Sequence, residues 1–147
     1  MAFKASNVLP ADAYLTIKRG AVQLKVNLQG FVTYMAANDI DYDYLRGVYR
    51  TLERAKDQFD TLKTTAGLAQ YAKDQESDQA YDVVTEFNSL ITTIQAAITW
   101  LDNNVSTNVT AKLPENWRDG TLISNTFTPV QTAGLRTALN AVSAEII

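Results

Sequence analysis

Apolar residues recur along this chain at alternating spacings of three and four, the period of one face of an α-helix. The pattern predicts four helices, over residues 10–37, 41–72, 78–105 and 128–146. Short polar corners separate the first three, so consecutive helices are expected to run antiparallel. With 147 residues and 46% apolar content, the chain fits one domain with a sizeable core. The sequence therefore predicts a single all-α domain, an elongated antiparallel four-helix bundle.

The segment 106–127 breaks the helical period and is rich in Thr, Asn and Pro. Within it, residues 117–123 (WRDGTLI) place an Asp-Gly turn between short apolar runs, which favours a short β-hairpin. Thr128 and Gln131 are spaced as a capping box around Pro129, which suits the first turn of a helix. We therefore expect one long irregular connection before the last helix.

Three of the predicted helices carry few charges on the face opposite their main apolar seam. From Phe87 to Leu101 there is no charged residue, a length of roughly 22 Å of helix. On the first helix a second apolar stripe, Leu15, Val22 and Val26, lies nearly opposite the main seam. A helix face in water usually carries charges. We therefore expect other polypeptide to lie against the first, third and fourth helices, with the second helix outermost.

The composition argues against several functional classes. The net charge of −3 disfavours a dedicated nucleic-acid binder, which needs a clustered positive surface. The chain has no cysteine and no histidine, which excludes disulfides, Cys or His zinc sites and Cys–His nucleophile pairs. The sequence shows neither a signal-peptide pattern nor an apolar run long enough for a membrane span. We expect no enzymatic activity, no catalytic, cofactor-binding or metal-binding residues and no small-molecule substrate.

Two charged motifs at the second predicted helix are candidates for a function. Asp39, Asp41 and Asp43 alternate like the start of a calcium loop, but Tyr44 and Arg50 stand where that loop needs Gly and Glu. We interpret them as a capping cluster for the second helix.

Arg46, Arg50 and Arg54 form a row spaced by four residues on the same helix. Such a row favours acidic partners. We expect a solvated face on which Glu53 and Asp57 supply the acidic partners. The alternatives are a salt bridge to another subunit and, after that, a contact with nucleic acid.

Trp100 lies away from the seam of its helix, beside the small residues Ser89, Thr93 and Ala96. One interpretation is that the last helix or the 106–127 connection covers it within the chain. The other is an aromatic anchor for a neighbouring subunit, a position in which Trp is favoured. The candidate interface residues are Leu15, Val22, Val26, Ser89, Thr93, Ala96, Trp100 and Trp117.

Four stretches together resemble a family of small all-helical structural proteins encoded among the neck, tail and baseplate genes of tailed bacteriophages. They are LPADAY at 9–14, LAQYA at 68–72, AYDVVTEF at 80–87 and FTPVQTAGLR at 127–136. The resemblance implies a virion component, present in the host cytoplasm before assembly, with no active site to carry over. Its implied partners are copies of itself or other virion proteins.

The alternative is a small helical adaptor or assembly chaperone. It would bind one partner helix in a groove between the first and third predicted helices.

Overall fold

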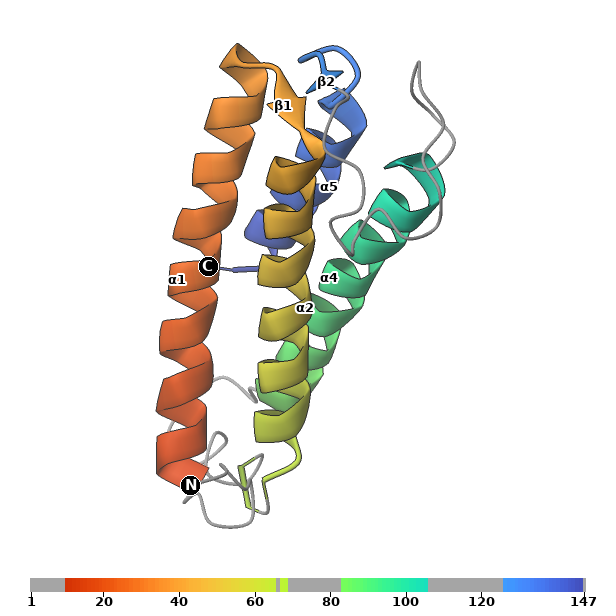
Figure 1. The fold of residues 1–147 in the computed structure, drawn as a ribbon. Helices are drawn as coiled ribbons and strands as arrows, with labels where there is room; N and C mark the ends of the chain where they lie inside the picture. Colours follow the sequence, from red (N-terminus) through yellow and green to blue (C-terminus); the bar gives the residue numbers. More distant parts are fainter. Residues whose placement is uncertain (1–9, 66, 69–82, 106–125, 147) are drawn as a thin grey trace.

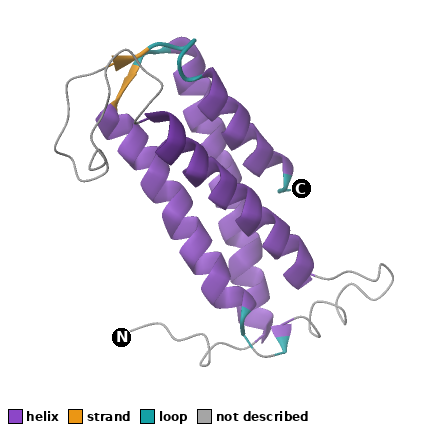
Figure 2. Cartoon of the chain, turned by 90° about the vertical axis from the view of Figure 1, so that its right-hand side faces the viewer, coloured by secondary structure: helices purple, strands orange, loops and turns teal. Residues whose placement is uncertain are grey.

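The computed structural model describes residues 10–65, 67–68, 83–105 and 126–146. Four helices lie within these ranges: α1 (Pro10–Ala37), α2 (Tyr42–Lys63), α4 (Val83–Val105) and α5 (Ala133–Ala144). They run alternately up and down in Figure 1, and the view in Figure 2 shows the same long, nearly aligned arrangement. The predicted all-α fold with four helices is confirmed.

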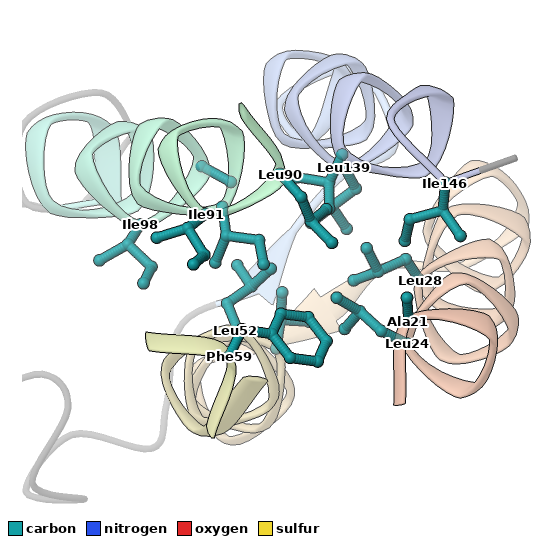
Figure 3. Packing of buried hydrophobic residues seen from close by; sticks show 14 of the residues in the cluster. Ala21, Leu24, Leu28, Leu52, Phe59, Leu90, Ile91, Ile98, Leu139 and Ile146 are labelled. Atoms are coloured by element: carbon teal, nitrogen blue, oxygen red, sulfur yellow. The ribbon is translucent and has the colours of Figure 1, made fainter. Parts of the chain in front are cut away.

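The helices form a closed ring around one core. Both α2 and α5 pack against α1, and the same two helices pack against α4. Figure 3 looks along the bundle and shows α1 and α4 at diagonal positions, with the labelled side chains between them. The prediction of a groove between the first and third predicted helices is therefore wrong, because α2 and α5 lie between them.

The core consists of the apolar seams that the helical period predicts. In α1, residues spaced by three and four point inward, from Ala13, Tyr14 and Ile17 to Leu28 and Met35. The largest side chains that are fully buried in the other helices are Tyr42, Leu52, Phe59, Leu62, Ile94, Leu101 and Leu135. Burying each large apolar side chain stabilises the fold by roughly 1.5–3 kcal/mol. All four helices contribute to one hydrophobic cluster.

The corner between α1 and α2 is fixed by a cap and by a small sheet. Asp41 is the N-cap of α2, and its Oδ1 accepts a hydrogen bond from Tyr44 N at 2.9 Å. The strands β1 (Ile40–Asp41) and β2 (Thr126–Phe127) pair antiparallel, with Ile40 opposite Phe127. The Phe127 ring packs edge-on against Tyr42, with ring centroids 4.7 Å apart. The chain just before α5 is thereby attached to the corner, as Figure 2 shows.

The second helix is shorter than the predicted 41–72. It ends at Lys63, and Thr65 N donates to Leu62 O at 3.1 Å in the turn that follows. Gly67 has a φ of 79°, in the left-handed region that terminates helices and favours glycine. The apolar period that continues to residue 69 therefore does not mark the helix end. Residues 69–72 lie outside the described part of the chain.

The last helix begins later than predicted. Thr128 N donates to Gln131 Oε1 at 2.9 Å and Gln131 N donates to Thr128 Oγ1 at 3.3 Å, which confirms the predicted capping box. The box closes a separate turn, in which Thr132 N donates to Thr128 O, and α5 starts at Ala133. The predicted range 128–146 is therefore wrong at its start.

Two other predictions fall partly outside the described residues. The third predicted helix corresponds to α4, and the start predicted for it, residues 78–82, lies outside those ranges. The hairpin predicted at 117–123 lies outside them as well. The sheet that the structure does describe joins β1 and β2, two segments that the sequence left as corner and connection.

Arg46 is not exposed to solvent, although the sequence predicts an exposed row of Arg46, Arg50 and Arg54. Its side chain is buried and forms an ion pair with Asp43, one turn before it on α2. Arg50 and Arg54 remain exposed. The predicted acceptor Glu53 instead receives a hydrogen bond from Tyr49 Oη. The prediction that all three arginines share one outer face is wrong, because Arg46 lies on the inward side of α2.

Candidate functional site

The outer face of α1 presents an apolar surface to solvent. Leu15 is 43% exposed, and Val22 and Val26 are each 57% exposed. Gly30 and Thr33 continue the row and are also exposed. At 100° per residue the five positions fall within a sector of about 80°, over roughly 27 Å of helix. The exposed Arg19 lies in the same sector, between Leu15 and Val22. We call Leu15, Val22, Val26, Gly30 and Thr33 the α1 stripe.

Two lysines that flank the α1 stripe are directed away from it. The Lys18 ammonium lies over the Tyr14 ring, 5.2 Å from its centroid. The Lys25 Nζ donates to Ile146 O at 2.8 Å and so joins α1 to the end of the chain after α5. These contacts hold the two cations against the bundle. The stripe from Val22 to Thr33 is consequently lined by uncharged side chains, a surface suited to another polypeptide rather than to water.

A second apolar surface is an open cleft of about 410 Å³ between α4 and α5. We call it the α4–α5 cleft, and its lining is Thr93, Ala96, Ala97, Trp100, Gly134, Thr137, Ala138 and Ala141. The Trp100 ring lies across Gly134, so close that a Cβ built on Gly134 would be 2.5 Å from Trp100 Cζ2. One face of the half-buried ring is therefore covered by α5 of the same chain, and the remainder lines the cleft.

The structure separates the predicted interface residues into groups. Leu15, Val22 and Val26 lie together on α1, as the spacing predicts. Thr93, Ala96 and Trp100 meet in the α4–α5 cleft.

Ser89 lies beyond the cleft and donates to Glu145 Oε2 at 3.1 Å. Trp117 lies outside the described residues. The sequence did not single out Gly134. Gly134 could have been noticed because it interrupts a helical stretch. A glycine there lowers helix stability by about 1 kcal/mol relative to alanine, which favours a position where a neighbouring side chain approaches closely.

An aromatic cluster that the sequence analysis missed lies where α1 meets α2. Tyr34, 45% exposed, stacks on Tyr44 with ring centroids 4.9 Å apart and planes 18° apart. Phe31 meets Tyr44 edge-on at 5.8 Å. Burial of the Tyr44 hydroxyl raises its pKa above the ordinary value of 10.0, and the neighbouring Tyr34 raises it further. Tyr44 therefore remains protonated and neutral at physiological pH.

Few ionisable side chains line the two hollows of the described surface. Among the described residues, the polar side-chain groups that line the α4–α5 cleft belong to Thr93, Thr137 and Trp100. An open hollow of about 560 Å³ beside α2 has a single carboxylate, Asp57, among its lining residues Thr16, Asp57, Gln58, Thr61 and Leu62. In the described ranges, neither hollow brings together two ionisable side chains, the arrangement typical of general acid–base pairs.

The helices described here also lack the combination of length and hydropathy that a membrane-spanning segment requires. No family model, curated protein or solved structure matches the chain. The function is therefore inferred from the residues and surfaces of this chain alone.

Proposed function

We propose that this chain is a structural component of a tailed-bacteriophage virion, in its neck, tail or baseplate. It acts through contacts with copies of itself or with other virion proteins. The sequence resemblance supports the virion setting, and the low charge on the outer face of α1 supports the contact role. No catalytic step is part of this function, and the apolar lining of the α4–α5 cleft is consistent with that.

The observation that carries the proposal is the α1 stripe. Its three aliphatic side chains are spaced seven and four residues apart on one helix, and each exposes about half of its surface. Covering apolar surface stabilises a complex by roughly 25 cal/mol per Å² before the costs of association are subtracted. A stripe of this kind on a long, rigid helix is typical of a helix–helix contact.

Quantitative mass spectrometry of purified particles of the encoding phage tests the virion role. We expect the chain at a fixed copy number relative to the other structural proteins in every preparation. Its absence from mature particles would overturn the proposal.

A complementation assay connects the α1 stripe to assembly. In a phage that lacks the gene, the wild-type chain and Val130→Glu should restore infectious particles, whereas Val22→Glu should reduce their yield at least tenfold. Val130 is the matched control because it is a valine, 85% exposed, that lies outside α1. Equal yields for Val22→Glu and Val130→Glu would show that assembly does not require the α1 stripe.

The α4–α5 cleft favours one alternative, an adaptor or assembly chaperone that receives apolar side chains of a partner protein. Its volume suits a small group of aliphatic side chains, and its threonines offer hydroxyls at the rim. The same mass spectrometry separates the two roles. A chaperone is present in assembly intermediates and lost from mature particles, whereas a structural component is retained.

A further inference from the structure

We infer that the α1 stripe of one copy of this chain docks in the α4–α5 cleft of the next copy. The contact joins two different surfaces, so it runs head to tail from copy to copy. This inference rests on the proposed function in taking the stripe as a protein contact, and it names the partner and the surface that receives the stripe. The shape, the charge and the register of the two surfaces support it.

The two surfaces lie on different sides of the bundle. The cleft is between α4 and α5. In Figure 3, α1 lies diagonally across the ring from α4, and its stripe is exposed on the side away from the core. One copy can therefore enter the cleft of its neighbour while its own cleft receives a third copy.

The shapes of the two surfaces are complementary. The stripe is a ridge, from which the exposed side chains of Val22 and Val26 project about one turn apart. The cleft is hollow because its described lining, apart from Trp100, consists of glycine, alanine and threonine. A row of aliphatic side chains that enters an apolar groove between two helices is a common mode of helix recognition.

The charges of the two surfaces are opposite. Between Asp12 and Asp39 the chain has three cations and no acidic residue, and one of these cations, Arg19, lies in the sector of the stripe. Glu145 lies at one end of the cleft, where it accepts a hydrogen bond from Ser89. Arg19 and Glu145 are both exposed, and among the described residues neither has an ion-pair partner. An arginine–carboxylate pair between copies would give each of them one.

The stripe and the cleft have the same length between their distinctive ends. On α1, Arg19 and Gly30 are eleven residues apart. On α4, Trp100 and Ser89, the residue that contacts Glu145, are also eleven residues apart. Both separations are roughly 16 Å along the helix axis. When α1 of one copy runs parallel to α4 of the next, the arginine therefore meets the glutamate in the same register that places the glycine against the tryptophan.

This register also fills the middle of the cleft. It places Val22 level with Thr93 and Val26 level with Ala96, two residues that line the cleft. At the far end, a Cβ built on Gly30 would have no heavy atom of its own chain within 4 Å. The indole of the neighbouring copy can therefore approach the α1 backbone there.

The opposite direction does not satisfy the shape and the charge together. With both valines in the cleft, an antiparallel α1 brings Arg19 to Trp100 and Gly30 to Glu145. A guanidinium can stack on an indole, but the glutamate is then left without a cation and the glycine without a large neighbour. We therefore place α1 of one copy parallel to α4 of the next.

Sedimentation analysis over a range of protein concentrations tests the self-association. We expect the wild-type chain to form oligomers larger than a dimer as the concentration rises, because a head-to-tail contact leaves one surface free at each end. Val26→Glu and Ala96→Glu should each weaken association at least tenfold, since each puts a charge into the apolar contact. Asn27→Glu and Gln95→Glu, at exposed neighbouring positions outside the stripe and the cleft, should associate like the wild type. A wild-type chain that stays monomeric, or that stops at a dimer, would overturn the inference.

A mixture of the two weakened variants distinguishes a head-to-tail contact from a symmetric one. Val26→Glu retains an intact cleft, and Ala96→Glu retains an intact stripe. An equimolar mixture should therefore form a one-to-one dimer of near wild-type affinity and nothing larger. A mixture that stays monomeric, or that forms longer oligomers, would contradict the pairing of stripe with cleft.

Charge reversal tests the register and the direction. Arg19→Glu and Glu145→Arg should each weaken association several-fold, because like charges then meet across the contact. The double variant Arg19→Glu/Glu145→Arg should recover most of the lost affinity, since the ion pair is restored with its signs exchanged. Single variants of wild-type affinity, or a double variant no stronger than either single variant, would reject the parallel arrangement.

Folding and the virion role are checked by separate readouts. Circular dichroism of each variant should match the wild type, because every substituted side chain is exposed. Mass spectrometry of particles tests the virion role whatever the oligomeric state in solution. A monomeric chain found at fixed copy number in particles would reject the self-association and leave the proposed function standing. Oligomers in solution together with absence from particles would reject the proposed function and leave the contact standing.

Discussion

Trp100 and Gly134 show how a single missing side chain determines a contact between helices. The ring lies where a Cβ on Gly134 would be, so the absence of that atom allows α4 and α5 to approach each other here. The sequence placed Trp100 beside small residues of its own helix. It gave no reason to connect the ring with a glycine 34 positions later.

We expect Gly134→Ala to destabilise the fold by about 1–3 kcal/mol, because the added methyl group overpacks the contact with Trp100. Gly47→Ala is the matched control, since a Cβ there would have no atom within 4 Å. In that position the better helix propensity of alanine should stabilise the fold by up to about 1 kcal/mol. Urea denaturation measures both changes. A stabilisation of similar size in both variants would show that Trp100 moves aside freely.

Tyr44 makes the stability depend on pH in the alkaline range. Burial, with a further contribution from Tyr34, raises the pKa of Tyr44 in the folded chain above that in the unfolded chain. The corresponding stabilisation is complete below about pH 10 and is lost as the pH rises through the folded-state pKa, because the unfolded state releases its proton first.

Tyr44→Phe should therefore lose less stability than the wild type between about pH 9 and about pH 11. Denaturation at both pH values measures the difference. An equal loss in the two proteins would assign the alkaline destabilisation to other groups.

At the scale of secondary-structure elements, the sequence predicted helix faces more reliably than helix ends. The bounds of α1 agree with the predicted 10–37 because Pro10 is well suited to a first turn. α2 ends before its apolar period does, because the chain turns at Thr64 and Thr65 and reaches the left-handed region at Gly67. A repeat of apolar residues says which side is buried, whereas the backbone conformation of the following residues decides where the helix stops.

Replacing Gly67 tests how firmly the end of α2 is set. Gly67→Ala should cost about 1–2 kcal/mol, because a side chain in the left-handed region meets the backbone. Gly67→Asn should cost less, since asparagine tolerates that region better. Thermal unfolding of the two variants ranks them. A Gly67→Ala variant more stable than the wild type would indicate that the backbone of the turn changes conformation and that α2 becomes longer.

At the scale of the whole molecule, the closed ring of helices makes each helix depend on two neighbours. α5 is the shortest of the four, yet it packs on both α1 and α4 and carries the fully buried Leu135 and Leu139. The pairing of β1 with β2 attaches the chain before α5 to the α1–α2 corner. We therefore expect the bundle to unfold as one cooperative unit.

Leu139→Ala should lower the free energy of unfolding by about 2–5 kcal/mol, because it leaves a cavity where α5 meets the core. Far-UV circular dichroism and tryptophan fluorescence should report the same midpoint. Asn140→Ala, a change at the neighbouring exposed position, should alter the stability by no more than about 0.5 kcal/mol. Separate transitions for the two probes would show that α5 detaches before the remaining helices.

The sequence by itself determined the four helices, their buried seams, a capping aspartate before α2, the reciprocal hydrogen bonds of Thr128 and Gln131, and the second apolar stripe on α1. These features depend on interactions within a few residues or on the period of one helix, so they can be read along the chain.

Only the tertiary structure decided which helices are neighbours, that β1 pairs with β2, that Arg46 is buried beside Asp43, and that Trp100 lies on Gly134. Those contacts follow from how the helices pack around a shared core. Helical periodicity fixes the direction in which a side chain points and does not specify which distant residue it meets.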